Sequence, residues 1–192
     1  MTDLSGYPSD ESDLITRSQR GDVAAFNTLI ERYQHLAYAL ALRMLGNPDT
    51  AADVTQDAFL SAFRAITTFR GDSFRPWLLR IVSNGCYDVF RAQRRRPATS
   101  LDEMLDPVES GSGDASLPTS LVDALRDPEQ LALRKEVIAA IEAALLLVAP
   151  DQRLAVVLAD IHGMSYDDIA QVVGVPVGTV KSRIARGRLR LR

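Results

Sequence analysis

Residues 164–191, MSYDDIAQVVGVPVGTVKSRIARGRLRL, decide how this chain folds. Ser165 is a residue type that caps helices, and Gly174 is a residue type that turns the chain at a helix end. Apolar residues recur at helical spacing on both sides of this turn, which are Ile169, Ala170 and Val173 before it and Val180 and Ile184 after it. The pattern predicts a short helix, a glycine turn and a second helix from Val177, which is a helix-turn-helix.

The second of these helices is strongly basic. Residues 174–192 contain no anion and six cations, which are Lys181, Arg183, Arg186, Arg188, Arg190 and Arg192. The whole chain has a net charge of −3, so the remainder carries −9. A basic helix fits the DNA major groove, where side chains reach base edges and cations neutralise phosphates. DNA binding is therefore predicted. The alternative is an ordinary pair of helices joined by a glycine turn, whose basic end is simply exposed to solvent.

The outward residues of this helix divide into two groups by position. On its first turns they are Thr179, Lys181, Ser182, Arg183 and Arg186. We expect Arg183 and Arg186 to contact bases and phosphates, and the later arginines, Arg188, Arg190 and Arg192, to position the DNA backbone.

Composition limits the other possibilities. With 192 residues, 46% hydrophobic and 24% charged, the chain is typical of one globular domain or two small ones. Residues 1–14, MTDLSGYPSDESDL, have no signal-peptide pattern, and no apolar run approaches the roughly 18 residues of a membrane span. The single cysteine, Cys86, excludes an internal disulfide. These features predict a cytoplasmic protein with no membrane insertion.

Three further helices are expected in the first half of the chain. Their ranges are 22–46, capped by Asp22 and closed by Gly46, 47–66, capped by Asn47 with Pro48 first, and 76–96, opened by Pro76. Apolar stripes support them: Val23, Phe26, Leu29, Ile30, Tyr33, Ala37, Leu40 and Met44 in the first, and Val54, Ala58, Phe59, Ala62, Phe63 and Ile66 in the second. No segment alternates as a strand does.

An acidic linker is expected between two helical halves. Residues 97–130 are rich in Pro, Gly, Ser and Asp and carry eight carboxylates against one cation, Arg126. Helices over 129–148 and 151–161 follow it. The sequence thus predicts an all-α fold of two small helical domains joined by a flexible linker: a tail over 1–21, a domain over 22–96, the linker over 97–129 and a domain over 130–192.

Two segments resemble a known family. GNPDTAADVTQDAFLSAFRAITTFRGDSFRPWLLRIVSNGCYDVFRAQRRR, 46–96, resembles region 2 of extracytoplasmic-function sigma factors of the sigma-70 family, and LADIHGMSYDDIAQVVGVPVGTVKSRIARGRLRL, 158–191, resembles their region 4. Both motifs occur in the family's order, and the resemblance covers nearly everything except the tail and the linker. It implies an initiation factor that directs RNA polymerase core to promoters and assists their opening.

The resemblance also implies sites. Asp53, Gln56 and Asp57 share one polar helix face that would bind the core β and β′ subunits, although a solvated surface would look the same. The −10 element would be bound by Phe69, Arg70, Asp72, Ser73, Phe74, Arg75, Arg80, Asn84 and Arg91, with bases stacking on rings and guanidinium planes. The −35 element would be bound by Val177, Gly178, Thr179, Lys181, Ser182, Arg183, Arg186 and Arg188.

Some of these residues have structural alternatives. Trp77 is expected in the core and not on a base, because Leu78 and Ile81 are its neighbours. Asn84 and Asp88 lie one turn apart and could hydrogen-bond to each other instead of to DNA. Gly85 departs from the family, which often has a larger apolar residue there, and a mid-helix glycine costs about 1 kcal/mol relative to alanine. The acidic linker could be a tether, or it could fold onto the basic surfaces and restrain DNA binding.

Other classes of protein fit less well. His35 and His162 belong to no ligand-spaced cluster, and Cys86 has no basic neighbour that would activate its thiol, so no catalytic site, metal or cofactor is predicted. A dimeric operator-binding regulator would use the same helix-turn-helix, but it needs neither the polar Asp53 face nor the basic aromatic loop. In the family, an anti-sigma factor is the usual partner and covers these same surfaces.

Overall fold

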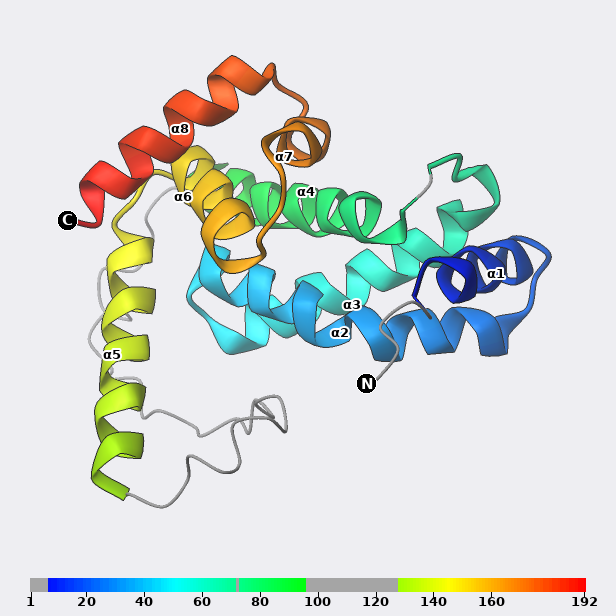
Figure 1. The fold of residues 1–192 in the computed structure, drawn as a ribbon, viewed down its shortest axis with the longest axis horizontal. Helices are drawn as coiled ribbons and strands as arrows, with labels where there is room; N and C mark the ends of the chain where they lie inside the picture. Colours follow the sequence, from blue (N-terminus) through cyan, green and yellow to red (C-terminus); the bar gives the residue numbers. More distant parts are fainter. Residues whose placement is uncertain (1–6, 72, 96–127) are drawn as a thin grey trace, which may run out of the picture.

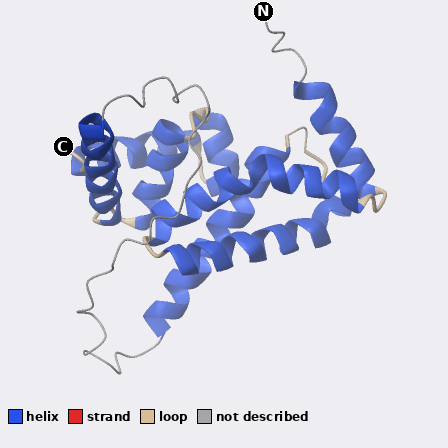
Figure 2. Ribbon diagram, turned by 90° about the horizontal axis from the view of Figure 1, so that it is seen from below, coloured by secondary structure: helices blue, strands red, loops and turns tan. Residues whose placement is uncertain are grey.

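The computed structural model describes residues 7–71, 73–95 and 128–192, and every regular element in these ranges is a helix (Figure 1; Figure 2). The prediction of an all-α chain with two helical domains is confirmed. The predicted linker, except for its last two residues, lies outside the described residues, and so does Asp72. None of the described helices is both long and apolar enough to cross a bilayer.

The first domain is built on a bundle of three helices whose ends follow the capping rules. They are α2 (Val23–Leu45), α3 (Pro48–Ala65) and α4 (Phe74–Arg95), and the short helix η1 (Ile66–Thr68) follows α3. The Asp22 carboxylate accepts a hydrogen bond from the Ala25 amide at 3.1 Å, and the Asn47 side chain accepts one from the Thr50 amide at 2.8 Å. Gly46 closes α2 with a φ of +74°, a conformation that glycine adopts without strain. The end signals predicted at Asp22, Gly46 and Asn47 are confirmed, whereas Pro76 does not open α4, which begins two residues earlier at Phe74.

The core of the bundle contains most of the predicted stripes. Phe26, Leu29, Leu40 and Met44 of α2 are at most 2% exposed, and they face buried residues of α3 and α4. The predicted burial is wrong for two residues of these stripes. Val23 is 54% and Phe63 is 43% exposed, because both lie at the rim of the bundle. The Phe63 ring still contacts Phe26 edge-on, at 5.0 Å between centroids.

Gly85 has a packing explanation in the close approach of α3 to α4. A Cβ built at this position would lie 3.0 Å from Cγ1 of Val54. A larger side chain would need Val54 to move, so the departure from the family pattern brings the two helices together.

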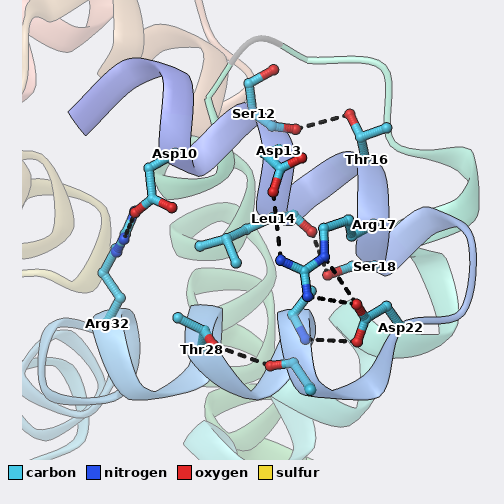
Figure 3. A network of polar contacts seen from close by, with 12 residues as sticks. Asp10, Ser12, Asp13, Leu14, Thr16, Arg17, Ser18, Asp22, Thr28 and Arg32 are labelled. Carbon is cyan, nitrogen blue, oxygen red and sulfur yellow. Dashed lines mark hydrogen bonds and ion pairs between the residues drawn. The ribbon is translucent and has the colours of Figure 1, made fainter. Parts of the chain in front are cut away.

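The N-terminal segment differs from the predicted tail. Helix α1 (Tyr7–Gln19) packs across α2, where Leu14 and Ile15 are buried (Figure 1). Figure 3 shows the polar contacts that fasten it: the Arg17 guanidinium donates to the Asp22 carboxylate at 2.8 and 2.9 Å, and Arg32 of α2 pairs with Asp10 of α1. This helix is not evident from the sequence pattern, because its exposed residues are mostly polar and only a narrow apolar face is buried.

The second domain contains the helix-turn-helix. Its helices are α5 (Pro128–Leu146), α6 (Pro150–Val156), η3 (Val157–Ile161), α7 (Tyr166–Val173) and α8 (Val177–Arg190). Helix α6 widens into the π-helical η3, where the His162 amide donates to the Val157 carbonyl five residues earlier at 3.0 Å. The chain then turns at Gly163, which has a φ of +63°, into α7.

The two domains pack directly on each other. Buried Arg153 of α6 donates to the Met44 carbonyl at the end of α2, and also to the Leu146 carbonyl at 2.6 Å and the Val148 carbonyl at 3.0 Å. The Leu146 side chain lies so close to Gly46 that a Cβ there would be 2.6 Å from it. Helix α7 packs along α4 on the neighbouring surface, so one hydrophobic cluster extends through both domains.

The position of Gly187 gives a test of the second domain's packing. In Gly187→Ala, the new Cβ would lie 2.5 Å from Cγ2 of Val156 and 3.2 Å from the Gln152 carbonyl oxygen, so α8 must shift away from α6. We expect the free energy of unfolding to fall by about 1–3 kcal/mol, measured by urea denaturation.

Gly178→Ala is the matched control, because nothing lies within 4 Å of a Cβ at that position. It should be neutral or stabilising, since alanine favours the helix. Equal stability of the two variants would contradict the close packing of α8 on α6.

Candidate nucleic-acid and polymerase interface

Helix α8 is presented by a well-defined turn. The Ser165 hydroxyl accepts a hydrogen bond from the Asp168 amide at 3.1 Å and donates to the Asp168 carboxylate at 2.7 Å, which caps α7 as predicted. Gly174 has a φ of +70°, and its amide donates to the Ala170 carbonyl at 2.8 Å. These contacts set the direction in which the chain enters α8.

The inner face of α8 is buried and its outer face is basic. Val180, Ile184 and Gly187 are buried against α6 and α7. The predicted −35 residues lie on or beside the open face: Gly178, Lys181, Arg186 and Arg188 are exposed, and Val177, Thr179, Ser182 and Arg183 are half-buried. The structure thus brings this predicted set onto one helix surface.

Two of the α8 cations pair with carboxylates of the same domain. The Arg188 guanidinium donates to the Asp160 carboxylate at 2.5 and 3.0 Å, and these hydrogen bonds raise the pKa of Arg188 above its ordinary value. Nε of Arg183 lies 3.2 Å from a carboxylate oxygen of Asp151 on α6. Within the described part of the chain, Lys181, Arg186 and Arg190 have no such ion pair, so they are the cations open to an external anion.

The predicted −10 residues lie in the loop before α4 and along α4 itself. Arg70 and Ser73 are exposed in the loop, and Arg80, Asn84 and Arg91 are exposed on the helix. The prediction that bases stack on Phe69 and Phe74 is wrong for this structure, because these residues are only 6% and 0% exposed. Their rings pack on Trp77, with centroids 4.8 and 5.5 Å away, so the three aromatics support the loop from inside. The expected core position of Trp77 agrees with this packing, although its side chain is half-buried.

Helix α7 of the second domain packs along α4 and faces this loop. A groove of about 440 Å³ separates them, and its lining includes Arg70, Trp77 and Arg80 on one side and Asp168 and Gln171 of α7 on the other. Nη2 of Arg75 donates to the His162 carbonyl at 2.5 Å across the same boundary. The candidate −10 surface is therefore partly covered by the second domain in this arrangement.

His162 is buried at this boundary. The residue is 9% exposed, and its Nε2 atom is buried with no hydrogen-bond partner in the described residues. Burial, with the nearby charges of Arg43 and Arg75, lowers the pKa of His162 from 6.5 to about 4. The imidazole is therefore neutral at pH 7, which avoids a third positive charge near Arg43 and Arg75.

The predicted polymerase residues form one exposed face of α3. Asp53, Gln56 and Asp57 are all exposed, as their helical spacing requires. Leu60, one turn further on the same face, is 46% exposed, and sequence reasoning missed it. It was detectable from its register, because the interval from Asp53 to Leu60 is two helical turns.

A groove between α3 and α4 joins this face to Asn84. Its volume is about 530 Å³, and its lining includes Asp57, Leu60, Arg64, Asn84 and Asp88. The alternative in which Asn84 hydrogen-bonds to Asp88 is wrong for this structure, because the Asp88 carboxylate pairs with Arg91 and Asn84 is exposed. Arg91, a predicted −10 residue, is thus partly neutralised by its own helix.

Comparison with known proteins gives the family. Residues 29–96 match the family described as Sigma-70 region 2, and residues 138–191 match Sigma-70, region 4. The RNA polymerase sigma-H factor of Pseudomonas aeruginosa is 40% identical over 179 residues, which are 93% of this chain and 90% of that relative. The ECF RNA polymerase sigma-E factor of Escherichia coli K12 is 39% identical over 91% of this chain and 88% of its own.

The chain belongs to the extracytoplasmic-function sigma factors of the sigma-70 family. Solved structures agree: CnrH in complex with the cytosolic domain of CnrY has a TM-score of 0.63 at 28% identity, covering 95% of this chain and 94% of its own. The sigma factor RpoE of Bartonella quintana, in complex with the anti-sigma factor NepR, has a TM-score of 0.62 at 27% identity, covering 88% and 95%. As a sigma factor, the protein directs RNA polymerase in transcription initiation, and an independent operator-binding regulator is not favoured.

The burial of His162 predicts how the stability of this sigma factor depends on pH. The unfolded chain binds a proton at His162 near pH 6.5, whereas the folded chain binds it only near pH 4. The stabilisation is therefore fully present above pH 6.5 and is lost as the pH falls through 4, a loss of roughly 3 kcal/mol from this group.

Urea unfolding between pH 7 and 4 measures this, with His162→Gln as the comparison because glutamine does not titrate. The wild-type curve should fall more steeply than that of the variant below pH 6.5. Parallel curves would mean that the buried imidazole is not the source of the pH dependence.

Proposed function

We propose that the three surfaces of this sigma factor divide the work of initiation. The α3 face with Asp53, Gln56 and Asp57 binds the β and β′ subunits of core polymerase. The loop before α4 binds the unpaired −10 strand, and α8 binds the −35 element in the major groove. The observation that carries this assignment is the outer face of α8, where Lys181 and Arg186 project from a helix whose opposite face is buried.

The roles within α8 follow from which cations are already paired. Lys181 and Arg186 contact bases and phosphates, and Arg190 holds the backbone of the DNA. Arg188 and Arg183 are oriented by Asp160 and Asp151, which fixes their side chains before DNA arrives. Thr179 and Ser182 are half-buried beside them, and their short side chains donate hydrogen bonds to the DNA. Val177 and Gly178 allow the start of α8 to approach the DNA closely.

The −10 role is carried by polar groups and not by stacking on Phe69 or Phe74. Arg70 and Arg80 pair with phosphates or stack with bases, and Ser73 and Asn84 hydrogen-bond to base edges. Arg75 is engaged by the His162 carbonyl, so its binding to DNA requires α7 to leave this surface. We therefore propose that the two domains separate when the protein joins polymerase, which also fits their binding of two promoter elements.

An anti-sigma factor is proposed as a regulatory partner. The two similar structures above are complexes, of CnrH with the cytosolic domain of CnrY and of RpoE with the anti-sigma factor NepR. In this chain, Val137, Ile138 and Ile141 of α5 are 48–50% exposed, and Leu147 is 85% exposed. These side chains are an apolar surface that such a partner would cover together with the α3 face.

The protein is proposed to act by binding alone and not as an enzyme. Burial raises the pKa of the Cys86 thiol to about 12, so it is not a thiolate nucleophile at neutral pH. His35 is exposed on α2, far along the chain from buried His162, and no role in covalent chemistry is assigned to either residue.

The α3 surface is tested by charge reversal. Asp53→Arg with Asp57→Arg should weaken binding to purified core polymerase roughly tenfold or more, measured by fluorescence titration, because both carboxylates are exposed on the proposed contact. Glu31→Arg, an exposed site on α2, is the control and should bind core as the wild type does. If the double variant and Glu31→Arg both lost binding to core polymerase, the loss would be due to the change in net charge and not to this face.

The DNA role of α8 is tested by salt dependence. Arg186→Ala should reduce the slope of log affinity against log salt by about 0.9 for duplex DNA, because one phosphate contact is lost. Arg20→Ala removes an equal charge from an exposed site in the first domain and should leave the slope unchanged. An unchanged slope in Arg186→Ala would remove this residue from the DNA contact.

A further inference from the structure

Helix α1 holds both ends of the loop between η1 and α4. Nε2 of Gln19 donates to the Phe69 carbonyl at 2.9 Å, at the start of the loop. The Phe74 amide, at its end, donates to Oε1 of Glu11 at 2.8 Å. The two contacts come from residues 50 and 63 positions away, so neither is an accident of local chain geometry.

Glu11 links this clamp to the core of the first domain. Its second oxygen, Oε2, accepts a hydrogen bond from the Tyr33 hydroxyl, and the Tyr33 ring lies 5.5 Å from the Phe74 ring. Burial first, and then the Glu11 hydrogen bond, raises the pKa of Tyr33, which keeps the phenol a donor. Both oxygens of the carboxylate are thus engaged, one at the N-terminus of α4 and one at α2.

Gln19 also affects how Arg70 is presented. The Phe69 carbonyl accepts a second hydrogen bond from Nη1 of Arg70 at 3.1 Å, and the same nitrogen donates to the Thr67 carbonyl at 3.2 Å. The exposed guanidinium is therefore folded back onto the loop that Gln19 fixes. If the Phe69 peptide turned, Arg70 would lose one of the two acceptors that orient it.

The clamp lies on a rigid element. Leu14 and Ile15 bury the inner face of α1, and the Arg17–Asp22 and Arg32–Asp10 pairs fasten it to the N-cap and to the first half of α2 (Figure 3). Phe69 and Phe74, the two ends of the loop, are thus held in place before a ligand arrives, so binding does not have to supply the free energy of fixing these two positions.

We propose that Glu11 and Gln19 are positioning residues for promoter opening: they hold Phe69 and Phe74, and with them Arg70, in the positions that receive the unpaired −10 strand. This inference rests on the proposed −10 role of the loop. Neither side chain needs to touch DNA, since each acts through a backbone group of the loop. The prediction of a tail over residues 1–21 gave this segment no function.

Holoenzyme reconstituted from core polymerase and full-length protein tests the proposal. The template is a promoter selected from a genomic pool by the wild-type holoenzyme, and strand opening is measured by permanganate reactivity of unpaired thymines. Glu11→Ala and Gln19→Glu should each reduce the opening equilibrium about five- to tenfold, because a half-buried capping or carbonyl contact is lost. Both should also discriminate less between templates with substituted −10 bases.

Two variants separate positioning from general support. Glu11→Gln retains an oxygen that can accept from the Phe74 amide, so it should restore opening and base discrimination to near wild type. Asp13→Ala, on the same helix, removes a carboxylate that pairs at 3.6 Å with Arg17 and is 61% exposed, so it should have no effect. Core affinity, binding to −35 duplex and melting temperature should stay at wild-type values in Gln19→Glu.

The outcomes are distinct. Wild-type opening and base preference in both Glu11→Ala and Gln19→Glu would overturn the proposal, and so would a loss of opening that only follows a loss of core affinity or melting temperature. If Glu11→Ala fails to fold, Gln19→Glu alone decides. A wild-type holoenzyme that opens no template at all would instead overturn the proposed −10 role on which the inference rests.

Discussion

The arrangement of this sigma factor depends on one buried cation. Arg153 extends from α6 into the junction of the two domains, where its guanidinium binds the carbonyls of Met44, Leu146 and Val148. These carbonyls end α2 and α5, and helix C-termini carry partial negative charge and unpaired acceptors. One side chain thus satisfies acceptors from both domains, although burial lowers its pKa below the ordinary arginine value.

That junction determines what the two candidate DNA surfaces can do. With α7 against α4, the outer face of α8 stays open, while Arg75 in the −10 region is bound to the His162 carbonyl. The boundary combines buried apolar packing with polar contacts at its edges, such as the 3.8 Å pair of Arg43 and Glu142. The proposed separation of the two domains would have to open this shared apolar packing, while the capped helices of each domain stay intact.

Much of this fold could be predicted from the sequence because its signals are local. The caps Asp22, Asn47 and Ser165 and the turns at Gly46 and Gly174 act within a few residues, and all were found. Long-range contacts could not be found in this way. Glu11 meets Phe74 across 63 positions, and Arg153 meets Met44 across 109, so composition and periodicity contain no trace of either pair.

The candidate site shows the same limit. Helical spacing correctly predicted exposed Asp53, Gln56 and Asp57, and the basic face of α8. It could not show that Phe69 and Phe74 turn inward onto Trp77, because an aromatic loop residue can face either the core or the solvent. Ion pairs such as Arg188 with Asp160 likewise depend on how α8 lies on η3, which only the fold reveals.

Run-off transcription tests the central claim most directly. Bacterial core polymerase would be assayed on a genomic promoter pool with and without the protein, and the protein alone would be assayed for DNA binding. The account predicts new start sites only when core and protein are both present, with shared −10 and −35 sequences upstream. No new start sites, together with tight binding of a dimer of the protein to duplex DNA in the absence of core, would contradict it.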